Sequence, residues 1–398
     1  MNKLSRRTVV ALFGATSIAG CLGIGSPLSS NSGREPPDGI PVAGCDTPPS
    51  WPTATGPAKR TGQTDIAFRA EPRSNELGGT DDRVFGQTWV VASNDHVFWL
   101  QDKETTIRRT HTETGNTDTL SLDHASRVSP TLACGRLAVH TYAGVSWVDA
   151  ETLEVVGTTP TASPHVSALA DDRLVYVSGF NDGLQAYGAD TGEPEWHLSI
   201  DHFVTGLSSA QHTAYVVDAS ADGGEVLSVD TQTGEVQWQT DVVGESYTNP
   251  VVGADVYTFD NDGTVHALDT DNGEQMWELT TEMTSPETTP AYRDGTVYVA
   301  DDASGTVTAL DAETGERHWQ TEIPRGDTDG RPTGTLTSPV CTPEFVLIGA
   351  SPGGLAVLRR DTGERRWQNS TYSFSSNLAV TEDAVYAVAT DGIVELKP

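Results

Sequence analysis

The chain has 398 residues, and Gly 39 and Pro 22 give it a composition suited to many short strands joined by tight turns. Asp+Glu 56 against Lys+Arg 24 gives a formal net charge of -32. A polyanion without a basic stripe repels phosphate backbones, which excludes nucleic acid as an expected partner.

Residues 1–21 have the pattern of an export signal that ends in a lipid attachment site. Arg6 and Arg7, followed by Thr8, resemble a twin-arginine motif, which directs folded proteins across the membrane. The apolar run that follows, residues 9–19, is too short to span a bilayer. It leads into Ile-Ala-Gly-Cys at residues 18–21, which resembles a lipobox, so we expect Cys21 to become the acylated N-terminus. The expected location is therefore the extracytoplasmic face of the cell membrane, where the lipid is the only membrane contact.

Residues 22–58 are rich in Ser, Gly and Pro and predict a flexible tether between the anchor and a folded domain at 59–398. Three cysteines remain after the anchor: Cys45, Cys134 and Cys341. Outside the cell a disulfide is permitted, and Cys45 could link the tether to the domain through either of the others. Spacing does not choose between these pairings, and buried free thiols remain an alternative.

A turn signature recurs along the whole domain with a nearly constant period. Its fullest form is Ala-Leu-Asp-Ala-Glu-Thr-Gly-Glu-Arg-His-Trp at residues 309–319, where the Trp follows the Gly by four positions. Five copies keep this frame, two weaker copies lie near Gly115 and Thr152, and residues 61–66 form an eighth. Repeats of this length predict a solenoid or a propeller.

Each copy also carries the pattern of a four-stranded antiparallel sheet, seen best at residues 290–310. Apolar residues alternate along each strand, and the fourth strand ends at the Trp. Asp294-Gly295 and similar pairs ending in Gly183, Gly263 and Gly392 supply the left-handed backbone of tight hairpins.

Such a sheet has two apolar faces and cannot stand alone, but packing copies around an axis buries both faces. The sequence therefore predicts an all-β, eight-bladed β-propeller, because residues 62–398 suffice for eight blades of roughly forty-two residues. The chain stops within the third strand of its last copy, so we expect residues 61–70 to provide that blade's fourth strand and close the ring. A single closed ring is expected to be monomeric.

The repeat resembles the tryptophan-docking repeat of the quinoprotein-type, or PQQ-like, propeller family over about residues 61–398. That family includes dehydrogenases that use pyrroloquinoline quinone (PQQ) and a propeller lipoprotein of the bacterial outer-membrane assembly machinery. The resemblance implies that each Trp stacks on a neighbouring blade at a Gly-centred turn. The residues concerned are Gly192, Trp196, Gly234, Trp238, Gly273, Trp277, Gly315, Trp319, Gly363 and Trp367.

The resemblance raises quinone-dependent oxidation as a function, and the residues argue against it. Dehydrogenases of the family typically have two adjacent cysteines, a calcium site, a catalytic Asp and longer chains, whereas no two cysteines adjoin here. The histidines show no metal-ligand spacing, and the Asp-rich segments at 260–263 and 269–273 fit hairpin turns better than calcium loops. We therefore expect no catalytic, cofactor-binding or metal-binding residues and no cofactor. Asn369 begins one N-glycosylation sequon.

The acidic residues are spread along the sequence, which is typical of haloarchaeal-type proteins adapted to concentrated salt. What remains is a rigid disc on a tether, a form that suits a binding or scaffold module for an unidentified protein partner. A solute- or sugar-binding propeller and a PQQ-dependent dehydrogenase are the alternatives.

Overall fold

The computed structural model shows the predicted eight-bladed propeller, and all of its described elements are strands. The residues that it describes are 62–69, 71–79, 88–126, 128–161, 169–171, 174–178, 183–200, 202–220, 223–244, 246, 248–282, 288–328, 331–374 and 376–398. The signal motif, Cys21 and the tether at 22–58 lie outside this range.

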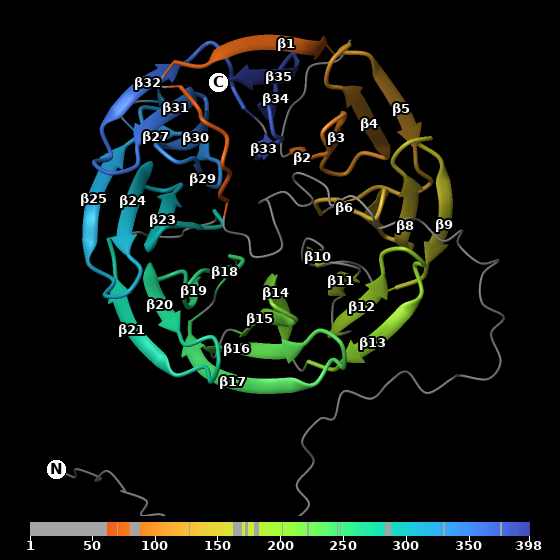
Figure 1. Cartoon of the computed structure of the whole chain (residues 1–398), viewed down its shortest axis with the longest axis horizontal. Helices are drawn as coiled ribbons and strands as arrows, with labels where there is room; N and C mark the ends of the chain where they lie inside the picture. Colours follow the sequence, from red (N-terminus) through yellow and green to blue (C-terminus); the bar gives the residue numbers. More distant parts are fainter. Residues whose placement is uncertain are drawn as a thin grey trace, which may run out of the picture.

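Four antiparallel strands form each blade, and consecutive blades follow one another around the ring (Figure 1). The strands of blades 1 to 4 are β2 (Thr88–Ala92), β3 (His96–Gln101), β4 (Thr106–His111) and β5 (Thr117–Ser121); β6 (Thr131–Ala133), β7 (Arg136–Thr141), β8 (Gly144–Asp149) and β9 (Val155–Thr159); β10 (Leu169–Asp171), β11 (Leu174–Ser178), β12 (Leu184–Gly188) and β13 (Pro194–Leu198); β14 (Phe203–Ala210), β15 (Thr213–Ser220), β16 (Gly223–Asp230) and β17 (Val236–Val243).

Blades 5 to 8 follow the same order, with an additional short strand in blade 7 and a hairpin before it. Their strands are β18 (Val251–Val252), β19 (Val256–Phe259), β20 (Thr264–Leu268) and β21 (Gln275–Thr280); β22 (Ala291–Arg293), β23 (Thr296–Asp301), β24 (Thr306–Asp311) and β25 (Arg317–Glu322); the hairpin β26 (Gly326–Thr328) and β27 (Arg331–Thr333); β28 (Thr335–Leu336), β29 (Val340–Cys341), β30 (Phe345–Ser351), β31 (Gly354–Arg359) and β32 (Arg365–Asn369); β33 (Ala379–Val380), β34 (Val385–Ala389), β35 (Gly392–Lys397) and β1 (Arg73–Gly79).

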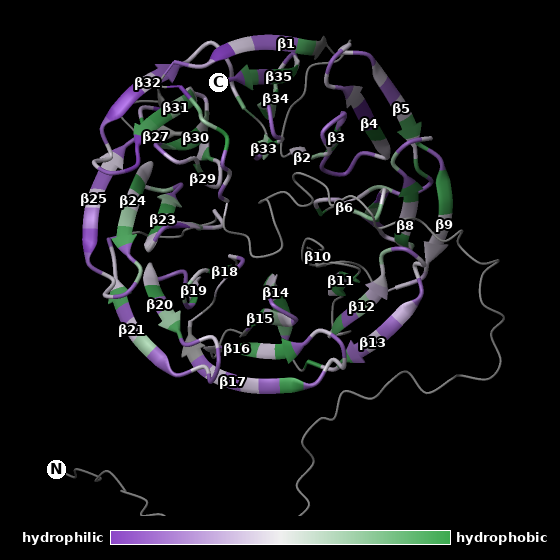
Figure 2. Cartoon of the chain, viewed as in Figure 1, coloured by the Kyte–Doolittle hydropathy of each residue, from purple (hydrophilic) through white to green (hydrophobic). Residues whose placement is uncertain are grey.

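Each blade runs from an apolar inner strand to a polar outer strand. The second strand of blade 8, β34, is buried throughout, whereas the fourth strand of blade 1, β5, is mostly exposed. Figure 2 shows the same gradient around the ring, with polar residues prominent on the outermost strands. The predicted alternation therefore buries the inner part of each blade, because neighbouring blades cover both of its faces there. In the fourth strand the chain continues beyond the tryptophan, so the prediction that this strand ends there was wrong.

The predicted hairpin turns adopt the left-handed backbone. Asp294 and Gly295 both have positive φ, 48° and 76°, between β22 and β23. The glycines at 183, 263 and 392 also have positive φ, which confirms the turn prediction at these positions.

The prediction of the closing strand was wrong in its residues, although the last blade is closed by a strand from the N-terminal part of the chain. The fourth strand of blade 8 is β1, which pairs with β35 in antiparallel register and not residues 61–70. Ile66 and Phe68 are instead buried in the core between blades 7, 8 and 1, while Gln63 forms a parallel bridge with Cys341 of β29. The polar run Arg-Ser-Asn-Glu at 73–76 suits the exposed outer edge, and the apolar residues 66 and 68 suit the interior.

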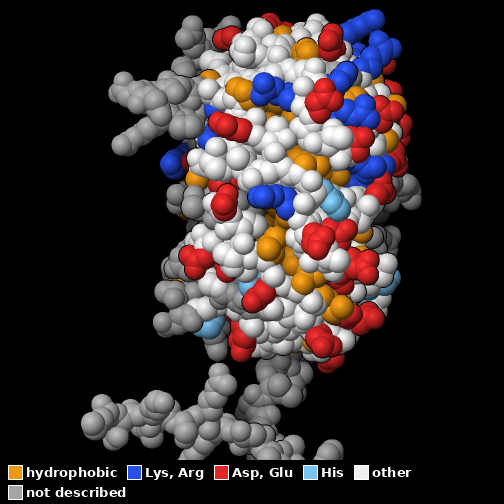
Figure 3. Space-filling model, turned by 90° about the vertical axis from the view of Figure 1, so that its left-hand side faces the viewer, with side chains coloured by type: hydrophobic (Ala, Val, Ile, Leu, Met, Phe, Trp, Pro, Cys, Tyr) orange, Lys and Arg blue, Asp and Glu red, His pale blue; other side chains and the backbone are white. Residues whose placement is uncertain are grey.

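Charges of both signs are interspersed on the rim. In Figure 3, which shows the left-hand side of the view in Figure 1, acidic side chains are scattered and basic side chains gather over one part of the surface. The outer strand of blade 7 contributes exposed Arg365 and Arg366. The excess of acidic residues therefore does not make every surface uniformly negative.

Candidate functional site

One row of three side chains in each blade faces the next blade, with one residue from each of strands two, three and four. In blade 3 the row is Tyr176, Ala186 and Trp196. The small alanine leaves room for the indole to lie against the tyrosine, with ring centroids 5.8 Å apart. Blades 4, 5 and 6 repeat the row with Tyr215, Ser228 and Trp238; Tyr257, Ala267 and Trp277; and Tyr298, Ala309 and Trp319.

The tryptophan of this row docks on the turn of the following blade. The indole Nε1 of Trp196 donates a hydrogen bond to the carbonyl oxygen of Thr231 at 2.7 Å. Its ring covers Gly234, where φ is +72° and an added Cβ would lie 2.8 Å from the indole. Glycine is required there because any side chain would strain the backbone and strike the ring. The corresponding pairs are Trp238 with Gly273, Trp277 with Gly315, and Trp319 with Gly363.

Gly192, at the start of this series, has a different partner. The Oγ1 of Thr159 donates to the carbonyl oxygen of Gly192 at 2.9 Å and accepts from Nε1 of Trp147 at 2.9 Å. Trp147 lies on the third strand of blade 2, opposite Gly157 on the fourth. In blade 2 the tryptophan is therefore on the third strand and the small residue on the fourth, the reverse of blades 3 to 6. The sequence pattern did not reveal this, because it places the Trp four residues after the glycine of the turn.

Blade 8 departs from the row more strongly, because Tyr386, Glu395 and Asn75 occupy its three positions. A carboxylate replaces the small residue, and an asparagine replaces the tryptophan. In addition, β35 and β1 come from distant parts of the chain, so the turn that joins strands three and four elsewhere is replaced by a break. Trp367 of blade 7, which would face that turn, is half-buried against the core of blade 8.

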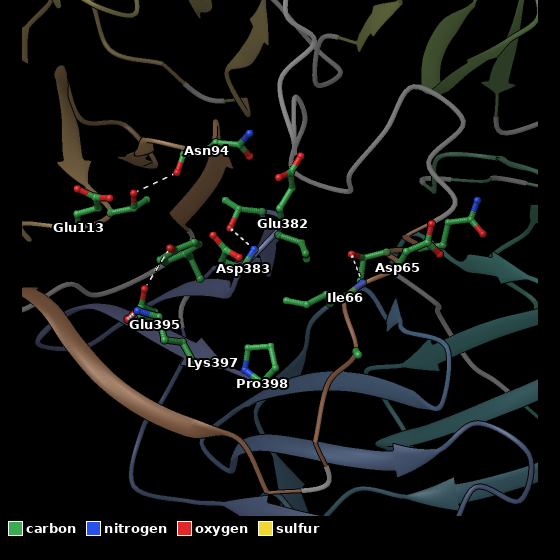
Figure 4. Close-up of a pocket in the computed structure, with 16 residues that line it drawn as sticks. Asp65, Ile66, Asn94, Glu113, Glu382, Asp383, Glu395, Lys397 and Pro398 are labelled. Atoms are coloured by element: carbon green, nitrogen blue, oxygen red, sulfur yellow. Dashed lines mark hydrogen bonds and ion pairs between the residues drawn. The ribbon is translucent and has the colours of Figure 1, made fainter.

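A cavity of about 1170 Å³ lies where blade 8 meets blade 1, beside this break. We call it the closure pocket. It is lined by Gln63, Thr64, Asp65, Ile66, Ala67, Asn94, Thr112, Glu113, Val380, Thr381, Glu382, Asp383, Tyr386, Glu395, Lys397 and Pro398. Figure 4 shows these residues converging from three sources: the segment before β1, two turns of blade 1, and blade 8.

The buried carboxylate of the closure pocket is held by two neighbours. Glu395 is 2% exposed, and its Oε1 accepts a hydrogen bond from the Tyr386 hydroxyl at 3.2 Å. Its Oε2 lies 3.0 Å from Nζ of Lys397. Burial, together with the negative charge of Glu395, raises the pKa of Tyr386 above its usual range. The hydroxyl therefore stays protonated and donates a hydrogen bond to Glu395. In blade 5 the matching Tyr257 hydroxyl donates to the next blade, at the carbonyl oxygen of Ala312.

The remaining charges of the closure pocket are acidic and exposed. Asp65 pairs with Arg293 at 2.8 Å. Glu113, Glu382 and Asp383 are exposed, and none of them forms an ion pair with another residue that the structure describes. The pocket thus has five carboxylates and one lysine, and it offers a negative potential and hydrogen-bond acceptors to a positively charged group. These acids come from distant sequence positions, so only the closed ring brings them together.

Cys341 is a free and buried thiol, whereas Cys134 is disulfide-bonded. The side-chain oxygen of Asn369 accepts a hydrogen bond from the Thr371 backbone at 2.8 Å, and use of the sequon stays a prediction. In the part of the chain that the structure describes, no group of three or more His, Cys, Asp or Glu side chains could hold a metal ion. Within the same residues, no helix has the length and hydropathy needed to cross a bilayer.

The ring of eight blades, with tryptophan docking on the next blade in blades 3 to 6, defines the class as an eight-bladed PQQ-like propeller. The sequence matches the family described as "Outer membrane protein assembly factor BamB" over residues 76–240 and 184–396. The chain therefore belongs to this family. A comparison with curated proteins finds no match.

Solved structures share the fold at low sequence identity. BamB from Moraxella catarrhalis is 18% identical, with a TM-score of 0.63, and the match covers 81% of this chain and 98% of that one. The quinohemoprotein alcohol dehydrogenase from Comamonas testosteroni is 14% identical with a TM-score of 0.64, covering 87% and 80%. A europium-containing methanol dehydrogenase is 12% identical with a TM-score of 0.66, covering 87% and 91%. These likenesses establish the fold and do not choose between a scaffold and an enzyme.

Proposed function

We propose that this chain is a non-catalytic binding propeller, held by a lipid at the outer face of the cell membrane, whose closure pocket recognises a basic segment of a protein partner. The observation that carries the proposal is the closure pocket itself. In blades 3 to 6 a docked tryptophan occupies the fourth-strand position that blade 8 leaves to Asn75, and in blade 8 the backbone of Leu77 lies against Gly115 of blade 1 instead. A cavity large enough for several side chains lies at this interface between blade 8 and blade 1.

The chemistry of the pocket favours a lysine or arginine side chain as the group that binds. The carboxylates of Glu113, Glu382 and Asp383 are exposed at its mouth, and Glu395 lies deeper. A guanidinium or ammonium group reaching them would form charge-assisted hydrogen bonds. Complementary charge accelerates encounter and selects among partners even where screening by salt limits its contribution to affinity. Membership of a family described as an assembly factor supports a protein partner over a small solute.

Neutralising the mouth of the pocket should weaken partner binding. We expect the triple variant Glu113→Gln, Glu382→Gln and Asp383→Asn to bind the partner about tenfold more weakly, because exposed ion pairs contribute about 0.2–1 kcal/mol each. The measurement is photo-crosslinking from native membranes with a reactive residue at Asn94, followed by an affinity titration of the captured partner. Glu235→Gln, Glu274→Gln and Glu316→Gln form a matched control, because these residues are exposed on the turns of blades 4 to 6.

Two results would contradict this proposal. Equal loss of binding in both triple variants would mean that general charge, and not the pocket, attracts the partner. Quinone absorbance after reconstitution with PQQ and calcium, together with dye-linked alcohol oxidation, would support the dehydrogenase alternative instead.

The lipid anchor is supported by the order of motifs at the N-terminus, where Arg6 and Arg7 precede an apolar run that leads to Cys21. We expect Cys21→Ser to release the protein from the membrane fraction into the medium, because the anchor is the only bilayer contact proposed. Cell fractionation and immunoblotting measure this shift. Cys341→Ser is the control, since that thiol is buried in the propeller. Retention of the Cys21 variant in membranes would contradict lipidation at this residue.

A further inference from the structure

The state of two cysteines restricts how the N-terminal region is attached to the propeller. The sequence contains Cys 4, at positions 21, 45, 134 and 341. Cys341 is free, and its complete burial raises the pKa of its thiol, so it stays protonated and unreactive. Cys134 is disulfide-bonded. Within one chain, its partner must therefore be Cys21 or Cys45.

Cys134 lies at the inner edge of the ring. It is buried in the turn between β6 and β7 of blade 2, where its φ is 48°. On the other side of the ring, Gly62 is held beside β29 of blade 7. The carbonyl oxygen of Gly62 accepts from the Cys341 amide at 2.7 Å, and the Thr64 amide donates to the Cys341 carbonyl at 2.8 Å. Figure 1 shows β6 and β29 on opposite sides of the centre of the ring.

The chain length upstream of Gly62 allows both partners and favours the nearer one. At about 3.3–3.6 Å per residue, residues 45–62 extend to roughly 55–60 Å, which is enough to cross the opening of a propeller. A shorter loop has a higher effective concentration of its ends, so Cys45 meets Cys134 more often than Cys21 does. If Cys21 is acylated as proposed above, its sulfur is also occupied by the lipid.

We propose that Cys45 and Cys134 form an intramolecular disulfide that fixes the tether to blade 2. Its formation removes two protons and two electrons from the two thiols, and a disulfide-bearing oxidant outside the cytoplasm takes them up and becomes a dithiol. The bond fixes both ends of residues 46–61, at blade 2 and at blade 7. It also restrains the segment 63–67, which lines the closure pocket. The bond itself does not depend on partner binding.

Peptide mapping of the full-length protein tests the bond directly. Thiols are blocked before lysis, and the denatured chain is digested with trypsin without reduction. Cleavage after Arg34, Lys59, Arg127 and Arg136 separates the four cysteines, with Cys45 on peptide 35–59 and Cys134 on peptide 128–136. The expected product is these two peptides joined, with a mass two hydrogens below their sum, which separates on reduction. Cys341 should be labelled only after denaturation.

Two results would overturn the proposal: a link between peptide 128–136 and the peptide that carries Cys21, or alkylation of Cys134 without reduction. A second readout is hydrogen exchange at the amides of 63–67. These should exchange several-fold faster in Cys45→Ser than in wild type. Unchanged exchange in Cys45→Ser would refute the restraint on the closure pocket, even with the bond present. The results for the disulfide and for hydrogen exchange do not bear on partner binding, which the crosslinking experiment tests separately.

Discussion

A chain that begins at residue 80 is expected to lose its monomeric folded form, whereas a chain that begins at residue 71 should keep it. The first lacks β1, whose ladder with β35 closes blade 8. Without β1, β35 becomes an unpaired edge and the outer side of blade 8 is uncovered, which favours aggregation or pairing with another chain. Size-exclusion chromatography with light scattering, at constant high salt, measures the change.

The chain that begins at residue 71 is the matched control, because it lacks Ile66 and Phe68 but retains β1. It should remain a monomer with a lower melting temperature, since two buried apolar side chains are lost from the core. A chain that begins at residue 62 also lacks Cys45 but keeps Ile66 and Phe68. The difference in melting temperature between the chains that begin at 62 and 71 therefore measures the loss of the two apolar side chains and not the loss of Cys45. A monomeric chain 80–398 with an unchanged melting temperature would show that β1 is not needed for closure.

The tryptophan docking should dominate the energetics of single blade interfaces. We expect Trp196→Ala to lower the free energy of unfolding by about 3–5 kcal/mol, because the residue is 3% exposed, packs on Tyr176 and Gly234, and donates to the Thr231 carbonyl. Denaturant titration followed by circular dichroism measures this loss.

Trp367→Ala is the comparison within the same chain. Trp367 has the same place in its repeat, but it is half-buried. The next blade, blade 8, has no Gly-centred turn for it to dock on, because its strands β35 and β1 are not joined by a turn. Its substitution should therefore cost less than half as much. Equal losses for the two variants would mean that burial of the ring on its own blade, and not docking on the next, provides the stabilisation.

Local features of the fold follow from the sequence because each depends on residues close together in the chain. The alternation around Val297 and Val299 predicts a buried strand, and Asp294-Gly295 predicts the hairpin before it. The Gly and Trp four residues apart predict the turn and the outer strand that follows it. Repetition of this unit, with the length of the chain, predicts eight blades and a ring.

The closing strand could not be chosen correctly from local pattern. Residues 61–66 resemble a repeat turn, but Ile66 and Phe68 are more apolar than an outer strand requires. Either β1 or the segment with Ile66 and Phe68 could pair with β35. The structure places the polar segment β1 at the exposed edge and the apolar segment in the core, and this choice depends on contacts with blades 7, 8 and 1, which are distant in the sequence. The exchange of Trp147 and Gly157 was missed for a related reason, since packing conserves the volume of a row and not the strand that supplies it.

The sequence by itself determined the repeating sheet, its turns, the number of blades and the excess of negative charge, because these depend on short-range periodicity and composition. Only the tertiary structure decided that β1 closes the ring, that Glu395 and Asn75 stand where blades 3 to 6 have a small residue and a tryptophan, and that carboxylates from three distant segments share one pocket. Ring closure brings together residues separated by most of the chain, and no local pattern encodes which of them meet.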